Sequence, residues 1–255
     1  MKLAKVFLLI LLVIILLRVS TIPLNASTPV IKGEIRVGVK NNSRPLAFLD
    51  ESGELQGLEI DIAKNLAKEL LQDETALTFV PVTNQERLDA LLNNQVNIVI
   101  ARLTANAARS QLVNFSTYYY LDGTGVITKD PSINSIHDLS TARIAVLSGS
   151  DSIDIIRSRL PTAELVGVDS YQEAYELLEA SEAIAFGADQ SILTGWVQEY
   201  PEYRLIAQSL SGEPLAIAIP KGLQYVSLHN QINKAIAKWR DSGWLRERAN
   251  YWGLP

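Results

Sequence analysis

The chain has 255 residues, 47% hydrophobic and 20% charged, a composition typical of a globular protein with room for about two domains. It contains no cysteine, which excludes disulfide bonds, thiolate metal sites and a cysteine nucleophile. The only histidines, His137 and His229, leave little material for a histidine-built metal centre or a Ser-His-Asp triad, so we expect no metal and no cofactor. The formal net charge of −5 disfavours a nucleic-acid partner.

The first residues have the pattern of an export signal. Lys2 and Lys5 precede an unbroken run of Val, Phe, Leu and Ile at 6–17. A basic start followed by an apolar core of this length is typical of a secretory signal, because a bilayer-spanning helix needs about 20 residues. We predict that residues 1–26 are a signal peptide, or an uncleaved anchor with Arg18 at its end. The rest of the protein is then periplasmic or otherwise extracytoplasmic.

The first half of the remaining chain alternates between strand and helix patterns. Strands are indicated by polar–apolar alternation or short apolar runs, and helices by apolar residues at helical spacing. Thr83 and Glu86 form a capping box that opens one of the helices. The alternating order predicts a mostly parallel α/β sheet. The predicted strands are 35–39, 77–82 and 96–101, and the predicted helices are 62–71 and the helix that follows 83–86.

The second half repeats this order without repeating the sequence, so we predict a second α/β lobe. Its strands are 144–147, 163–168 and 183–186, and its helices are 152–159, 170–181 and 190–199; the chain closes with a strand at 215–219 and helices at 223–241 and 243–252. Two crossings between the lobes would return the C-terminal helices to the first lobe. The predicted limits are 33–121 and 214–255 for the first lobe, 125–210 for the second, and 121–124 and 211–214 for the hinge.

Polar side chains follow the predicted strand at 96–101, where ligands of open α/β sheets bind. Thr104 offers a hydroxyl, and Arg109 offers a rigid fork of donors that suits a carboxylate. Taken alone, an arginine such as Arg109 more often lies on a helix surface and pairs with an acid. Neighbouring motifs favour the binding role.

Four motifs occur in a fixed order along the chain. They are Gly57-Leu58-Glu59-Ile60-Asp61, Asn97-Ile98-Val99-Ile100, Leu103-Thr104…Arg109 and Phe115-Ser116-Thr117-Tyr118-Tyr119. Together they resemble the polar amino-acid-binding proteins of ABC importers, solute-binding protein family 3, and in pattern most closely the glutamate/aspartate-binding type. The resemblance extends from about Ile35 to Trp252.

The resemblance implies an α/β, two-lobed periplasmic-binding-protein-like fold with two hinge crossings. It also implies an extracytoplasmic protein that captures a polar L-amino acid as the lobes close. The captured solute is handed to an ABC transporter permease in the membrane. Such a protein is expected to be a monomer, to need no cofactor and to catalyse no reaction.

The resemblance also assigns roles to individual residues. Arg109 forms a bidentate pair with the ligand α-carboxylate, Thr104 contributes its hydroxyl, and the backbone at Ala101 and Leu103 completes the site. Asp189 receives the ligand α-ammonium. The alternative for Asp189 is that it caps the helix predicted at 190–199.

A second contact to the α-carboxylate is expected from backbone N–H groups at Ser150 and Asp151, where a helix begins. The family usually has a neutral threonine at the position of Asp151. The carboxylate of Asp151 therefore has two interpretations, a ligand contact or a cap on its own helix.

Three cations bear on side-chain specificity. Lys40 ends the first predicted strand, Arg87 follows the first capping box, and Arg102 stands where the family usually has Ser or Gly. If they converge, they favour glutamate or aspartate, with glutamine or asparagine next. The alternative is a solvated face paired with Glu86 or Asp89.

One further residue bears on the ligand class. Ser43 stands near the position where many relatives stack an aromatic ring on the ligand, which disfavours cationic and aromatic solutes and leaves glutamine open. A ligand-sensing subunit for a signalling partner and an exported dehydratase-like enzyme on the same fold remain alternative functions.

Overall fold

The computed structural model describes residue 31 and residues 33–206 and 209–255. The predicted export segment at 1–26 lies outside these residues. Within them, no helix is both long and apolar enough to cross a membrane.

The first of two five-stranded sheets has the order β5-β1-β6-β13-β7. Strand β1 is parallel to β5 and β6, whereas β13 is antiparallel to β6 and β7. The carboxyl ends of β1 and β6 therefore lie at the same edge. The strands are β1 (Ile35–Val39), β5 (Leu77–Pro81), β6 (Ile98–Val99), β7 (Asn114–Asp122) and β13 (Glu213–Ile219).

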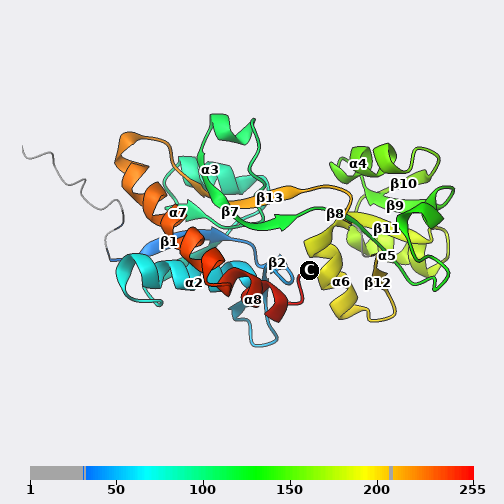
Figure 1. Cartoon of the computed structure of the whole chain (residues 1–255), viewed down its shortest axis with the longest axis horizontal. Helices are drawn as coiled ribbons and strands as arrows, with labels where there is room; N and C mark the ends of the chain where they lie inside the picture. The colour runs from blue at the N-terminus through cyan, green and yellow to red at the C-terminus, as the bar shows by residue number, and fades with distance from the viewer. Residues whose placement is uncertain (1–30, 32, 207–208) are drawn as a thin grey trace, which may run out of the picture. The chain divides into compact units, whose positions relative to one another are not determined.

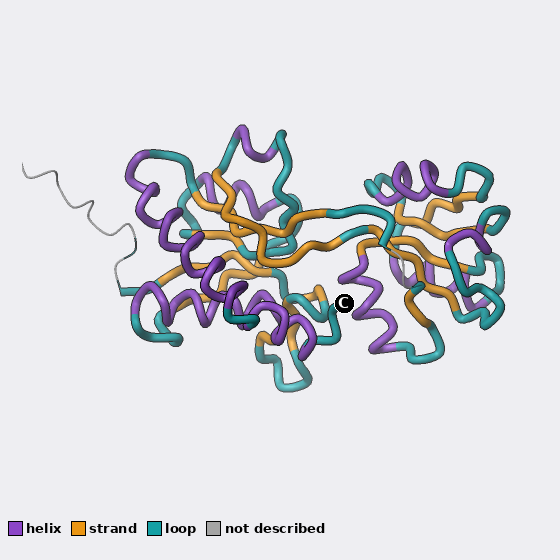
Figure 2. Tube along the Cα trace, viewed as in Figure 1, coloured by secondary structure: helices purple, strands orange, loops and turns teal. Residues whose placement is uncertain are grey.

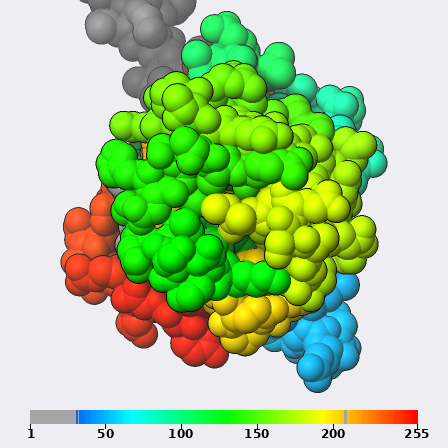
Figure 3. All heavy atoms as spheres, turned by 90° about the vertical axis from the view of Figure 1, so that its right-hand side faces the viewer, coloured from blue at the N-terminus to red at the C-terminus, as the bar shows by residue number. Residues whose placement is uncertain are grey.

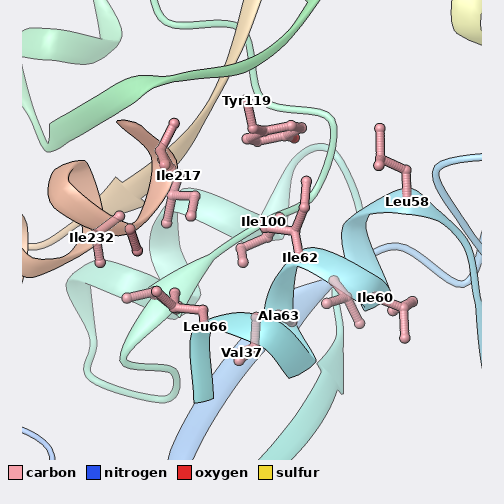
Figure 4. Packing of buried hydrophobic residues seen from close by; sticks show 14 of the residues in the cluster. Val37, Leu58, Ile60, Ile62, Ala63, Leu66, Ile100, Tyr119, Ile217 and Ile232 are labelled. Atoms are coloured by element: carbon pink, nitrogen blue, oxygen red, sulfur yellow. The ribbon is translucent and has the colours of Figure 1, made fainter. Parts of the chain in front are cut away.

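Helices cover both faces of the first sheet (Figure 1). Helices α2 (Leu58–Leu71), α7 (Val226–Asp241) and α8 (Trp244–Tyr251) bury apolar residues in one core with β1 and β13. Helix α3 (Glu86–Leu92) packs in a separate apolar cluster with residues of β6 and β13. Figure 4 shows the larger core, in which Tyr119 from β7 lies with Ile100 and Ile62.

The second sheet has the order β10-β9-β11-β8-β12, with β8 antiparallel to both its neighbours. Helix α4 packs into one apolar cluster and helices α5 and α6 into another, so this sheet is also covered on both faces (Figure 2). The elements are β8 (Thr124–Thr128), β9 (Arg143–Leu147), α4 (Ser152–Arg159), β10 (Glu164–Val168), α5 (Tyr171–Glu179), β11 (Ala185–Asp189), α6 (Gln190–Glu199) and β12 (Arg204–Leu205). In Figure 3 the segment from β8 to β12, coloured green to yellow, forms a continuous surface.

Small elements complete the described chain. A three-stranded sheet precedes α2, and three short 3₁₀ helices lie in connections. They are β2 (Asn42–Ser43), β3 (Ala47–Leu49), β4 (Leu55–Gln56), η1 (Arg109–Gln111), η2 (Ile136–Leu139) and η3 (Leu223–Tyr225).

The chain passes between the two sheets in two antiparallel segments. Strand β7 ends at Asp122 and β8 begins at Thr124, while β13 begins at Glu213 directly opposite Asp122. A Cβ on Gly123 would lie 2.4 Å from the Ser211 carbonyl oxygen, so only glycine allows the two segments this close together. The two-lobed α/β fold expected from the resemblance is therefore present, with two crossings between its sheets.

Most predicted elements match the structure, and the differences lie at their ends. The helix predicted at 62–71 begins earlier, at Leu58, and the strand predicted at 96–101 is only Ile98–Val99. The strand predicted at 183–186 is Ala185–Asp189 instead, because its pairing with β8 continues to Asp189 opposite Thr124. Apolar runs locate a strand, but hydrogen bonding to its neighbour sets the ends.

Candidate functional site

The segment that follows β6 is held by hydrogen bonds on both sides of Arg102. Arg102 has φ 46°, a left-handed conformation that is uncommon for a residue with a Cβ. Its backbone N–H donates to Glu59 Oε1 at 2.6 Å. The Arg87 guanidinium donates to the carbonyl oxygens of Ala101 and Arg102 at 2.7 and 2.8 Å. The strand end is therefore a rigid platform, and Leu103 extends it by accepting from the backbone N–H of Ala216.

Glu59 is a fully buried carboxylate beneath this platform. It lies in the first turn of α2, directly after Gly57, whose Cβ would meet the Leu46 carbonyl oxygen at 2.3 Å. Oε1 of Glu59 accepts the Tyr119 hydroxyl at 2.5 Å, and Oε2 has no partner among the described residues. Burial raises the pKa of Glu59, while these hydrogen bonds oppose the shift.

Arg102 connects the two sheets through an ion pair with Asp189, the last residue of β11. Asp189 is in the N-cap position of α6, but its side chain makes no capping hydrogen bond. The capping role considered for Asp189 is therefore absent, and its carboxylate points to Arg102. Arg102 does not join Lys40 and Arg87 as a free cation.

Arg109 and Thr104 lie close together. The Arg109 guanidinium donates to the Thr104 carbonyl oxygen at 2.9 Å, and the Arg109 backbone N–H donates to the Asn106 side chain. Thr104 forms an isolated antiparallel bridge with Leu215 of β13. Both Thr104 and Arg109 are half-buried, so their polar groups stay accessible to a solute.

Lys40 and Arg87 are buried, each only 7% exposed. Neither side chain therefore lies on a solvated face. Burial lowers the pKa of Lys40 and the charges of Arg102 and Arg87 lower it further, while the charges of Glu59 and Glu86 oppose the shift. Burial, Arg109 and Arg102 lower the pKa of Arg87 to about 10. The four cations thus act on one another, and an anion among them would relieve the repulsion.

Carboxylates gather at the crossings between the two sheets. Asp122 is buried and accepts from the Ser191 backbone N–H at 3.0 Å and from its hydroxyl at 2.5 Å, which ties the crossing to α6. Burial raises the pKa of Glu213, and the charges of Asp189, Asp122 and Asp151 raise it further. Asp122 and Glu213 thus lie at the ends of β7 and β13 that lead to the second sheet.

Ser150 and Asp151 precede α4 as expected. The Ser150 hydroxyl is buried and has no partner among the described residues, whereas Asp151 is exposed. Asp151 makes no side-chain capping bond, so the cap considered for it is absent. Its charge contributes to the raised pKa of Glu213.

A pocket of about 200 Å³ lies between the segment around Ser43 and helices α5 and α6. Tyr171, Tyr175 and Trp196 line it opposite Ser43 and Arg44, so aromatic surface comes from the second lobe. Partial burial raises the pKa of Tyr171, which also responds to the charges of Arg102 and Asp189. The pocket therefore borders the ion pair.

Sequence reasoning missed three participants. Glu59 and Tyr119 lie in motifs that mark the family and Asp122 lies in the predicted hinge, but their burial gives them their roles. A charged residue inside an apolar run, as in Leu58-Glu59-Ile60, was the available signal for Glu59. No described group of three or more His, Cys, Asp or Glu side chains has the arrangement of a metal site.

A family model for bacterial extracellular solute-binding proteins, family 3, matches residues 35–255. The chain belongs to this family. The resemblance found in the sequence motifs is thus confirmed, and so is the two-lobed fold.

Individual members of this solute-binding family are moderately similar. The glutamine-binding protein GlnH of an ABC transporter in Bacillus subtilis is 32% identical over 222 residues, covering 86% of this chain and 81% of the relative. The glutamate-binding protein GluB of Corynebacterium glutamicum is 26% identical over 71% of this chain and 64% of the relative. A solved ancestral amino-acid-binding protein, a precursor of cyclohexadienyl dehydratase, matches with TM-score 0.68 and 28% identity over 86% of this chain and 95% of that one.

Proposed function

We propose that this solute-binding protein captures an L-amino acid with an acidic side chain, glutamate or aspartate, for an ABC transporter permease. The observation that carries the proposal is the burial of Lys40 and Arg87 near the charges of Arg102 and Arg109 at one strand end. Glu59 and the ion pair with Asp189 offset part of this positive charge, and a zwitterion with one extra carboxylate would offset more of it.

The proposed pose follows from the charge distribution. The α-carboxylate binds Arg109 and the Thr104 hydroxyl, with backbone groups at Ala101 and Leu103, and the α-ammonium faces Asp189. The unpartnered Ser150 hydroxyl and the exposed Asp151 approach from the second lobe. The side-chain carboxylate then lies toward Lys40 and the platform that Arg87 supports.

We propose that the crossings at 121–124 and 211–214 act as the hinge, between lobes at 33–121 with 214–255 and at 125–210. The close antiparallel pairing of Glu213 with Asp122 supports this, because two adjacent strands bend together. The pocket beside Tyr171 borders the site on the face opposite these crossings.

Glutamine is the second candidate ligand. The Bacillus subtilis relative, 32% identical, is named for glutamine, and glutamine is isosteric with glutamate. The cation group distinguishes the two candidates, because a neutral amide leaves the mutual repulsion of Lys40 and Arg87 unrelieved.

The test is a thermal-shift screen of the twenty L-amino acids. At 100-fold excess over the dissociation constant, binding to the folded form adds about 2.7 kcal/mol, a shift of roughly 5–10 °C for a chain of this size. We expect glutamate and aspartate to give the largest shifts, then glutamine and asparagine. If no amino acid shifts the melting temperature, the proposal is wrong.

We further propose that the solute is bound as a monomeric complex without turnover. Incubation with the bound amino acid, followed by mass spectrometry, should recover it unchanged. The similarity to a dehydratase precursor motivates a second assay with prephenate and arogenate. Product formation in either assay would overturn the binding-only function.

A further inference from the structure

The ion pair between Arg102 and Asp189 occupies the position proposed for the ligand ammonium. The guanidinium Nη1 donates to Asp189 Oδ2, and the two side chains are only 15% and 31% exposed. A cation of the protein's own is therefore already present on the carboxylate that the ligand would neutralise.

Hydrogen bonds to the backbone of Arg102 fix its position. Glu59 accepts its N–H and Arg87 donates to its carbonyl oxygen, which keeps the residue at φ 46°. The Asp189 backbone is fixed in turn by pairing with Thr124 of β8. The backbones of both Arg102 and Asp189 are thus held by hydrogen bonds.

A second observation points from Arg102 to a ligand. Its Nε is buried and has no hydrogen-bond partner among the described residues, although a buried guanidinium N–H is normally paired. An acceptor oxygen of a bound acid would satisfy this donor while Nη1 stays on Asp189. A guanidinium has enough donors to serve both groups at once.

We propose that Arg102 is a specificity-determining residue that stands in for the ligand ammonium, so that the site also takes dicarboxylic acids and their monoamides without an amino group. The proposal rests on the amino-acid function proposed above. With Asp189 unpaired, an acid lacking the ammonium would leave a partly buried carboxylate without a cation, which is costly. With Arg102 on Asp189, that cost does not arise.

The remaining charges fit this substrate class. Arg109 and Lys40 are available for the two ends of a dicarboxylate, and neither is an ion-pair partner of a described acid. An amino acid, in contrast, has to share Asp189 with Arg102 or displace it. Arg102 therefore reduces the preference for an α-amino group.

The experiment compares two matched ligand pairs by calorimetry, L-glutamate with glutarate and L-glutamine with glutaramate. Each pair differs by the α-amino group alone. For the wild-type protein, we expect the amino acid and its desamino partner to have dissociation constants within about tenfold of each other, in whichever of the two pairs binds. In Arg102→Gly and Arg102→Gln the preference for the amino acid should rise about 10- to 100-fold, as expected for one desolvated charge pair.

The variants are chosen to separate charge from folding. Glycine suits the left-handed backbone at 102, glutamine keeps much of the side-chain volume, and Arg102→Lys should retain the wild-type ratio. Arg157→Gln is the matched control, since Arg157 pairs with Asp154 on the exposed surface of α4.

The outcomes distinguish the two proposals. An unchanged ratio in both neutral variants, or a wild-type protein that binds the amino acid but not its desamino partner, overturns the role of Arg102 and leaves the amino-acid function intact. If neither member of either pair binds the wild type and no other amino acid does, the proposed function fails and this inference with it.

Discussion

Glu59 accepts the backbone N–H of Arg102 at 2.6 Å, so a buried carboxylate of the first lobe fixes the residue whose side chain reaches Asp189 in the second. Tyr119 binds the same carboxylate oxygen at 2.5 Å. A buried acid thus helps to determine where a cation of the site is placed.

The burial of Glu59 predicts a pH dependence of stability. Because burial raises its pKa above the ordinary value of 4.5, the folded protein keeps a proton that the unfolded chain has already lost. The free energy of unfolding therefore falls as pH rises from 4.5 through the folded-state pKa. We expect Glu59→Gln to remove this part of the slope in urea unfolding measured across that range.

The control for Glu59 is Glu51→Gln, at an exposed turn. If the unfolding free energies of wild type and Glu59→Gln stay parallel across the pH range, Glu59 does not carry the slope. The hydrogen bonds to Tyr119 and Arg102 would then fully compensate for the burial of the charge.

Replacement of Arg109 by alanine should abolish binding of every amino acid. The variant removes the partner of the α-carboxylate, which all amino acids share, and leaving that group without its cation in a desolvated site costs about 3–5 kcal/mol. Calorimetry with glutamate, aspartate, glutamine and asparagine measures the loss, and Arg157→Ala is the control. Loss of a single ligand class would show that Arg109 binds the side chain instead.

Lys40 should set the preference for an acidic side chain. Lys40 is buried and is in none of the ion pairs between described residues, although the charges of Glu59 and Glu86 act on it, and we expect it to pair with a ligand carboxylate. We expect Lys40→Ser to reduce the preference for glutamate over glutamine by about 2–3 kcal/mol, or 30- to 150-fold. The measurement is the ratio of the two dissociation constants.

Arg87 should affect both specificity and stability. Its guanidinium donates to two backbone carbonyls, so Arg87→Ala should lower the free energy of unfolding by about 1–3 kcal/mol besides shifting the glutamate-to-glutamine ratio. If neither this variant nor Lys40→Ser changes the ratio, the acidic-ligand proposal is wrong. The amino-acid function would stand, because it depends on Arg109, Thr104 and Asp189.

Substitution of Gly195 tests whether α6 must contact the segment at Arg44 in the ligand-bound form. It lies inside α6, where alanine normally stabilises a helix by about 1 kcal/mol. Here a Cβ would lie 2.3 Å from the Arg44 carbonyl oxygen, which belongs to the segment before α2. We expect Gly195→Ala to raise the ligand dissociation constant about 5- to 150-fold, the equivalent of about 1–3 kcal/mol of overpacking.

The matched measurement for Gly195→Ala is thermal stability without ligand, which should change little because the proposed hinge would let α6 move away from Arg44. An unchanged affinity would show that the contact between α6 and Arg44 is not needed in the ligand-bound form. A large loss of stability without ligand would show the same contact to be part of the fold itself.

The sequence alone determined the fold class and the positions of most helices. Helices at 152–159 and 190–199 match the structure residue for residue, because their apolar spacing and flanking residues are local properties. The family was also accessible, because its motifs follow one another in a fixed order along the chain.

Only the tertiary structure decided what the charged residues do. Lys40, Arg87 and Arg102 are all cations in the sequence, but the structure gives them different environments. Lys40 is buried and is in no ion pair between described residues, and Arg87 donates to backbone carbonyl oxygens. Arg102 forms an ion pair with Asp189. Asp189 lies 87 residues from Arg102, and no local pattern encodes which acid a cation meets. Ion pairing and burial depend on the packing of two separate sheets, whereas helix and strand periodicity depends on neighbours along the chain.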